Sequence, residues 1–330
     1  MKSIFFGGGT PSLMKPFVAE GIINHIAKLG VVNEDTEITL EANPTSYETD
    51  KFIEFRNAGV NRVSIGVQSL SDHDLEQLGR KHSGDEAIKA ISSAANLFDR
   101  YSFDLIYARQ NQTLKDWQQE LKAALKLANG HISLYQLTIE KGTPFYRLFK
   151  DGKLILPEED IGADMYEWTN DYLKSNGYNR YEISNYAISG QECQHNLAYW
   201  NYEEYLGIGP GAHSRLHNTS SIEAMMMIHN PGKWLDSVYE VGHGIQSRKP
   251  LTQLEIVEEI LMMGMRLEQG IDEKEFLRIT RQRFDDVLDM IATQQYTEMQ
   301  LLIRDTKGSR LTTKGLILHN YLVPRMIKRS

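Results

Sequence analysis

The sequence contains a single cysteine, Cys193, among its 330 residues. One thiol excludes a disulfide within the chain and any metal site made only of the chain's own cysteines. No run approaches the roughly 20 apolar residues that a membrane helix needs, and the first residues lack a cationic segment followed by an apolar one. Lys and Arg number 36 against 44 Asp and Glu. These absences favour a cytoplasmic protein and argue against a membrane span or a nucleic-acid partner.

Short β-branched and aromatic runs alternate with amphipathic segments in the first part of the chain. This alternation is typical of βα units around a parallel sheet, so we predict an α/β fold. The expected strands are Ser3–Phe6, Glu37–Leu40, Arg62–Gly66, Ser102–Tyr107, His131–Gln136 and Tyr178–Ile183. The expected helices are Ser12–Leu29, Thr49–Ala58, Ser71–Gly79, Gly84–Phe98, Thr113–Ala128 and Glu158–Asn176.

The pattern changes near residue 250. Residues 218–250 carry few periodic signals, and we expect loops with one short helix there. From Thr252 onward, three short helices, a hairpin turning at Lys307-Gly308 and a last helix predict a small winged-helix-like domain. Its mixed charge favours a structural or protein-facing role over DNA binding. The predicted divisions are a barrel domain with an extension at 1–217, a connecting segment at 218–250 and a C-terminal domain at 251–330.

Polar residues stand at the carboxyl ends of the predicted strands, where parallel sheets bind their ligands. They are Gly7-Gly8-Gly9-Thr10, Glu41, Gln68, Ala108-Arg109-Gln110 and Gln136 with Thr138. Alternation along the fourth strand places the Asp104 carboxylate on the concave face, where it needs a partner or a cationic ligand. Taken singly, the glycines could form an ordinary turn and Glu41 a helix cap. Together, these residues predict one ligand site.

Several motifs occur in a fixed order along the chain. They are Phe6-Gly7-Gly8-Gly9-Thr10-Pro11-Ser12, Glu41-Ala42-Asn43-Pro44, Ser64-Ile65-Gly66-Val67-Gln68-Ser69, Leu78-Gly79-Arg80 and Asp104-Leu105-Ile106-Tyr107. In order and spacing they resemble the radical S-adenosylmethionine proteins related to oxygen-independent coproporphyrinogen III oxidase. Two further motifs, Tyr181-Glu182-Ile183-Ser184-Asn185-Tyr186 and His195-Asn196-Leu197-Ala198-Tyr199-Trp200, look like those of the HemW haem chaperones within that group.

The resemblance implies a partial (β/α)6 barrel that binds S-adenosylmethionine at its rim. By position, it implies that backbone donors of Gly8, Gly9 and Thr10 hold the methionyl part of the ligand. It also implies that Glu41 accepts hydrogen bonds from the ligand, and that the nucleoside or a second ligand contacts Gln68, Arg80 and Asp104. A zwitterionic ligand with a sulfonium cation suits such a set of donors, carboxylates and a cation.

The same resemblance implies haem as a second ligand and a haem-acceptor protein as a partner. The haem-associated residues would be His195, Tyr199, Trp200 and His213, with Tyr186 adding aromatic surface and His195 a possible ligand of the haem iron. A histidine beside aromatic residues can equally be a hydrogen-bonded structural residue. Both readings stay open at this point.

The sequence departs from the family in two places. The segment Cys-x-x-x-Cys-x-x-Cys that binds a [4Fe–4S] cluster is absent, and Cys193 alone cannot replace it. We therefore expect a chaperone-like protein without radical chemistry in this chain; the alternatives are an enzyme like the oxidase, or an inactive truncated fragment. The second departure is the loop after the fourth strand, where Ala108-Arg109-Gln110-Asn111-Gln112 stands for the usual Gly-Leu-Pro-Gly-Gln.

Only two residues precede the first expected strand, Ser3–Phe6. On the family pattern, the barrel's first strand and the cluster segment would lie upstream of it. We therefore expect Ser3–Phe6 to be an apolar edge strand, and exposed apolar edges recruit other strands. The expected consequence is self-association of the chain.

Overall fold

The computed structural model describes residues 1–219 and 221–328. They form two compact units, Met1–His195 and Asn196–Ser330. The domain division predicted from the sequence at residue 217 stays a prediction. Within the described residues, no helix is both long and apolar enough to cross a membrane.

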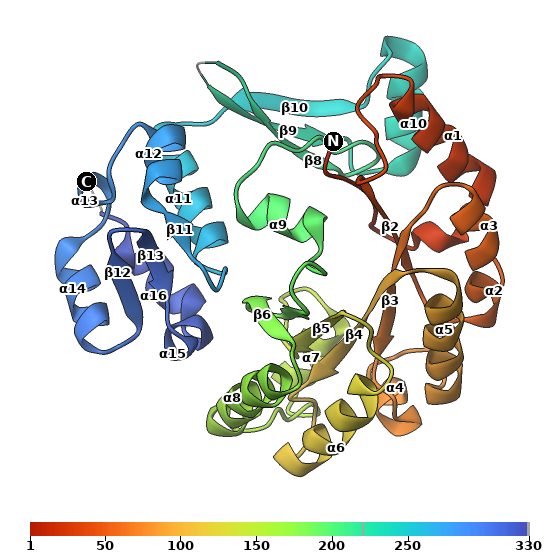
Figure 1. Cartoon of the computed structure of the whole chain (residues 1–330), viewed down its shortest axis with the longest axis horizontal. Helices are drawn as coiled ribbons and strands as arrows, with labels where there is room; N and C mark the ends of the chain where they lie inside the picture. The colour runs from red at the N-terminus through yellow and green to blue at the C-terminus, as the bar shows by residue number, and fades with distance from the viewer. Residues whose placement is uncertain (220, 329–330) are drawn as a thin grey trace. The chain divides into compact units, whose positions relative to one another are not determined.

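The first unit is built on a seven-stranded sheet of order β1-β2-β3-β4-β5-β7-β6 (Figure 1). Strands β1 to β5 run parallel to one another, and β7 pairs antiparallel with both β5 and β6. The strands are β1 (Ser3–Phe6), β2 (Glu37–Ala42), β3 (Arg62–Gln68), β4 (Arg100–Tyr107), β5 (His131–Gln136), β6 (Asn179–Glu182) and β7 (Asn185–Ala187). The curled, partial barrel predicted from the sequence is confirmed.

Helices cover the outer face of this sheet, as Figure 1 shows for α3, α5, α6 and α8. The helical elements of the first unit are the 3-10 turn η1 (Pro11–Leu13), α1 (Pro16–Ala27), α2 (Ser46–Thr49), α3 (Phe52–Asn57), α4 (Asp72–Gln77), α5 (Gly84–Leu97), α6 (Leu114–Leu125), α7 (Pro144–Lys150) and α8 (Glu159–Ser175). Helix α5 begins with a capping box in which Ser83 and Glu86 bond each other's backbone N–H groups. Helix α6 begins with a second capping box, between Thr113 and Asp116, so caps of this kind fix where these two helices begin.

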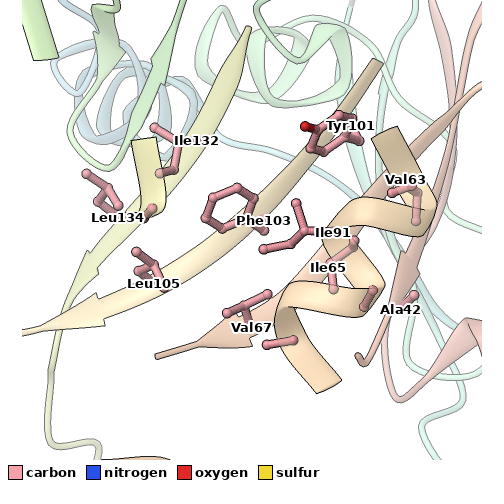
Figure 2. Packing of buried hydrophobic residues seen from close by; sticks show 14 of the residues in the cluster. Ala42, Val63, Ile65, Val67, Ile91, Tyr101, Phe103, Leu105, Ile132 and Leu134 are labelled. Atoms are coloured by element: carbon pink, nitrogen blue, oxygen red, sulfur yellow. The ribbon is translucent and has the colours of Figure 1, made fainter. Parts of the chain in front are cut away.

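The hydrophobic core lies between the outer face of the sheet and these helices. Alternate residues of β2 to β5 point into it, while Ile91 of α5 packs from the helix side (Figure 2). Figure 2 shows the strand residues Ala42, Val63, Ile65, Val67, Tyr101, Phe103, Leu105, Ile132 and Leu134. The residues between them therefore face the concave side. These inward positions are largely polar, for example Thr39, Ser64 and Asp104.

The second unit contains two three-stranded antiparallel sheets, β10-β9-β8 and β11-β13-β12. Its strands are β8 (His213–His217), β9 (Ile222–Met227), β10 (Ile245–Pro250), β11 (Ile271–Asp272), β12 (Leu302–Asp305) and β13 (Gly308–Leu311). Its helices are α10 (Pro231–Val241), α11 (Gln253–Gly264), α12 (Glu273–Thr280), α13 (Phe284–Val287), α14 (Met290–Glu298), α15 (Thr313–Ile317) and α16 (His319–Met326). Helix α9 (Gln194–Trp200) spans the division between the units.

The prediction of loops over residues 218–250 is wrong. Within the part of that segment that the structure describes, β9 and β10 pair with each other and flank the expected helix, α10. Strand β10 was missed because it is exposed at nearly every position, so its sequence has no apolar alternation. The three short helices predicted after Thr252 correspond to α11, α12 and α13, and the hairpin around Lys307 and the helix α15 after it also occur as predicted. Helices α14 and α16 and strand β11 were not predicted.

Candidate functional site

The glycine turn after β1 contacts the end of β2 directly. The Gly8 N–H donates a hydrogen bond of 3.1 Å to Glu41 Oε2. A Cβ atom at Gly7 would lie 2.8 Å from the Phe5 ring and 3.3 Å from that carboxylate oxygen, so a larger residue there would have to displace the Phe5 ring. Gly8 and Gly9 both have positive φ angles, 78° and 60°, which side-chain-bearing residues rarely adopt. The turn and Glu41 thus form one ordered edge of the rim.

A buried carboxylate that the sequence analysis missed holds this edge in place. Glu48 is 3% exposed. It accepts hydrogen bonds from the Asn43 N–H at 2.8 Å, the Thr45 hydroxyl at 3.2 Å and the Ser12 hydroxyl. The Asn43 amide also donates to Thr10 Oγ1 at 3.3 Å. The Thr-x-x-Glu spacing of Thr45 and Glu48 resembles a capping motif and was the available signal.

Asp104 lies half-buried on the inner face of β4, as alternation predicts. Its register partner on β5 is Ser133. Burial raises the pKa of Asp104 from 3.8 to about 7, and the negative charge of Glu41 adds to the rise. A hydrogen bond with Ser133 and the charges of Arg62 and Arg80 act in the opposite direction. A carboxyl with so high a pKa in a polar concavity is typical of a binding site.

Three other predicted residues belong to the same rim. Burial raises the pKa of Glu41 too, offset in part by the Gly8 hydrogen bond. Gln68, at the end of β3, is 9% exposed and has a φ of 70°. Arg80 is exposed, and its charge acts on Asp104. On β2, Thr39 is fully buried, and its hydroxyl has no hydrogen-bond partner among the described residues.

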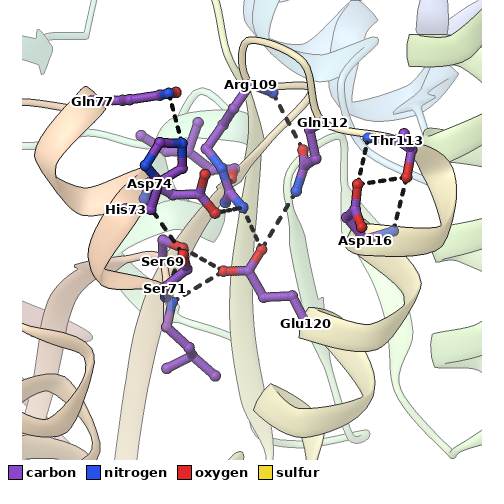
Figure 3. Close-up of polar contacts among 12 residues, drawn as sticks. Ser69, Ser71, His73, Asp74, Gln77, Arg109, Gln112, Thr113, Asp116 and Glu120 are labelled. Carbon is purple, nitrogen blue, oxygen red and sulfur yellow. Dashed lines mark hydrogen bonds and ion pairs between the residues drawn. The ribbon is translucent and has the colours of Figure 1, made fainter.

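The loop after β4 is closed by a buried ionic network. The Arg109 guanidinium contacts Asp74 Oδ2 at 2.8 Å and Glu120 Oε2 at 2.6 Å (Figure 3). The other oxygen of Glu120 accepts hydrogen bonds from the Ser69 hydroxyl and the Leu70 N–H. The family's glycines are replaced, yet the loop keeps left-handed backbone at Ala108 and Asn111, with φ angles of 54° and 59°. The structure thus preserves a tight turn without glycine.

His195 lies in the first unit, stacked on the Phe5 ring at 4.2 Å between ring centroids. The buried carboxylate of Glu37 accepts the N–H groups of Gln194 and His195 at the start of α9, at 3.1 and 3.4 Å. Burial lowers the pKa of His195 to about 4; Glu37 opposes the shift and Arg62 adds to it. The imidazole is therefore neutral near pH 7, which is the form that ligates iron.

The other haem candidates have different surroundings. Tyr199 packs against Tyr205 with ring centroids 4.5 Å apart, and the Arg266 guanidinium lies 4.5 Å from the centre of the Trp200 ring. Trp200 lines a cavity of about 650 Å³ in the second unit, and its ring N–H is buried without a hydrogen-bond partner among the described residues. His213 is exposed at the start of β8 and does not line that cavity.

Tyr186 was expected to offer aromatic surface to haem, and that expectation is wrong. Its side chain is 1% exposed within the core, and its hydroxyl bonds Asn170. Cys193 is buried, with its sulfur 3.5 Å from Glu37 Oε1. Within the described residues, no three His, Cys, Asp or Glu side chains are arranged to hold a metal ion. The residues present therefore do not fit a [4Fe–4S] cluster, which needs several thiolates.

Known proteins resemble the chain over nearly its whole length. The Radical SAM superfamily model matches residues 1–124, and the HemN C-terminal domain model matches residues 251–318. The bovine "Radical S-adenosyl methionine domain-containing protein 1, mitochondrial" is 37% identical, over all of this chain and 76% of that protein. The "Heme chaperone HemW" of Bacillus subtilis is 32% identical, over 97% of this chain and 84% of that protein.

A solved structure shares the fold. The coproporphyrinogen III oxidase HemN of Escherichia coli superposes with a TM-score of 0.79, over 98% of this chain and 77% of that one. Its sequence identity of 20% supports a common fold and nothing finer.

The "Heme chaperone HemW" of the same organism is 42% identical over 66% of this chain and 56% of its own length.

Proposed function

The chain belongs to the HemW-type proteins of the radical S-adenosylmethionine family, and on that premise we propose that it binds haem and S-adenosylmethionine and passes haem to an acceptor protein. The observation that carries the proposal is the likeness to proteins named haem chaperones, combined with the polar rim around Glu41 and Asp104. A cytoplasmic location stays a prediction, because relatives named as mitochondrial are among those that the chain matches.

The rim residues fit S-adenosylmethionine chemically. The ligand carries an amino group, a carboxylate and a sulfonium cation, and the rim offers two carboxyl groups, Glu41 and Asp104, beside the cation Arg80. The turn at Gly8 and Gly9 lets the backbone approach a ligand closely. The orphaned hydroxyl of Thr39 lies on the same strand as Glu41, two residues before it. Bound there, the ligand would be held by Gly8, Gly9, Thr10, Glu41, Gln68, Arg80 and Asp104.

For haem, the neutral imidazole of His195 is the candidate ligand of the iron. Tyr199, Trp200 and His213, which belong to the second unit, stay predicted haem-associated residues. Haem supplies a flat apolar macrocycle with an iron centre, which suits a histidine that packs against an aromatic ring. The stacked ring of Phe5 holds the His195 imidazole in one orientation. Because the chain's single cysteine does not fit the cluster, we derive no radical step for it.

A titration of hemin into the purified protein tests the haem proposal. We expect a saturable, one-to-one shift of the Soret band that weakens in His195→Ala. His25→Ala, at an exposed histidine of α1, is the matched control and should bind hemin as the parent protein does. Binding that is unsaturable, or equal in both variants, would count against His195 and the proposed function.

Calorimetric titration with S-adenosylmethionine tests the rim. Glu41→Ala should weaken binding by about 1–3 kcal/mol, the scale for polar groups left unmatched. Glu54→Ala, at a residue on α3 outside the rim, is the control. Formation of 5′-deoxyadenosine by the iron-reconstituted, dithionite-reduced protein would overturn the expectation of absent radical chemistry and favour the oxidase-like alternative.

A further inference from the structure

The buried network around Arg109 joins the two loops that follow β3 and β4. The guanidinium bonds Asp74 on α4 and Glu120 on α6 (Figure 3). One of its nitrogens also donates to the Ile106 carbonyl oxygen at 2.5 Å. Gln112 bridges as well, because its side-chain oxygen accepts the Arg109 N–H at 3.2 Å. A residue that stands where the family has an apolar leucine thus bonds three separate elements.

Glu120 carries the connection onward to the predicted ligand residues. Its Oε1 accepts the Ser69 hydroxyl at 2.5 Å and the Leu70 N–H at 3.0 Å, and these two residues directly follow Gln68. At the other end of α4, the Arg80 N–H donates to the Leu75 carbonyl at 2.8 Å. The orientation of α4 therefore sets the position of the Arg80 backbone. The network therefore holds the segment from Gln68 to Arg80 at two places, at its start through Glu120 and at helix α4 through Arg109.

The ion pairs of Arg109 are buried, so losing one partner is costly. The Arg109 side chain is 4% exposed, against 10% for Glu120 and 23% for Asp74. One cation faces two carboxylates, so its loss leaves two like charges together in a desolvated place. Gln68, Ala108 and Asn111 also adopt left-handed backbone, which persists without glycine only where surrounding contacts impose it. Contacts from Glu120 and Gln112 flank these three residues.

We propose that Arg109 and Glu120 form a clamp that positions the segment from Gln68 to Arg80 for the rim ligand. The clamp does not touch the ligand itself and acts through Gln68 and Arg80. This inference rests on the proposed S-adenosylmethionine site for its effect on binding, whereas the ordering of the segment stands without it.

Hydrogen exchange and ligand titration of four variants test the clamp. Glu120→Gln keeps an acceptor for Ser69 and Leu70 but places an amide against Arg109, and Arg109→Leu removes the cation. Arg109→Lys keeps the positive charge but lacks the planar guanidinium that reaches both carboxylates. Its exchange rates and ligand affinity should lie between those of the parent protein and Arg109→Leu. Arg215→Leu is the control, because it breaks a partly buried pair with Glu259 of similar length, 2.6 Å, within the second unit.

We expect the amides of residues 69–80 to exchange about tenfold faster in Glu120→Gln and Arg109→Leu, and S-adenosylmethionine to bind about tenfold more weakly. Arg215→Leu should change neither. In a fifth protein that combines Arg109→Leu with Glu120→Gln, the loss should be smaller than the sum of the two single losses, because both substitutions remove the same Arg109–Glu120 contact. Unchanged exchange in folded Glu120→Gln and Arg109→Lys would overturn the clamp. If the parent protein binds no S-adenosylmethionine, the proposed ligand is wrong, while the exchange data still decide the clamp.

Discussion

Replacing Asp104 with asparagine should stabilise the protein without ligand, in a manner that depends on pH. Burial raises the folded-state pKa of this carboxyl from 3.8 to about 7. Between these two values the unfolded chain binds fewer protons than the folded chain, so stability falls as pH rises from about 4 to about 7. The neutral asparagine avoids this loss and keeps the shape of the side chain.

The size of the effect follows from the two pKa values. At 1.36 kcal/mol per pKa unit, the gain in unfolding free energy reaches about 4 kcal/mol at pH 8 at most, and about 1.5 kcal/mol at pH 5. Urea denaturation of both proteins at these two pH values measures it. The same substitution should weaken S-adenosylmethionine binding, because the carboxylate would no longer meet the ligand's positive charge. Equal stability of the two proteins at pH 8 would refute the claim that burial of the Asp104 carboxylate destabilises the folded protein.

Three further predictions concern other parts of the chain. Since burial lowers the pKa of His195 to about 4, hemin affinity should stay constant between pH 8 and pH 6 in absorbance titrations. Trp117→Phe should lower the unfolding free energy by about 1–3 kcal/mol, because Thr169 loses the indole N–H bond of 2.7 Å; denaturant melts measure this. Light scattering should show concentration-dependent self-association through β1, reduced in Ser3→Lys; a monodisperse parent protein at all concentrations would contradict it.

The parallel sheet could be predicted because its strands are buried on the outer face. Val63, Ile65 and Val67 alternate with polar residues and one glycine along β3, and all three are fully buried. The same alternation along β4 predicts that Asp104 lies on the concave face. A pattern with a period of two residues carries both the strand and its orientation. The parallel strands of the first unit could therefore be predicted because one face of the sheet is buried.

The ionic network could not be predicted, since nothing local in the sequence joins its members. Arg109 lies 35 residues from Asp74 and 11 from Glu120. The sequence showed only that two glycines and a proline were missing from the loop. No sequence pattern indicates that Arg109 stabilises the turn after β4 through ion pairs with distant residues. The same holds for β8 and β10, which each pair with β9 through backbone hydrogen bonds without a clear apolar alternation in their own sequences.

The central claim is that the polar rim at the carboxyl ends of the parallel strands is a ligand site, and an NMR titration tests it most directly. We expect S-adenosylmethionine, added to the ¹⁵N-labelled protein, to shift the amide signals of Gly8, Gly9, Glu41 and Gln68 in a saturable manner. Residues of the second unit, such as those around Trp200, should not respond. Saturable shifts confined to the second unit, or no saturable shift anywhere, would contradict the account.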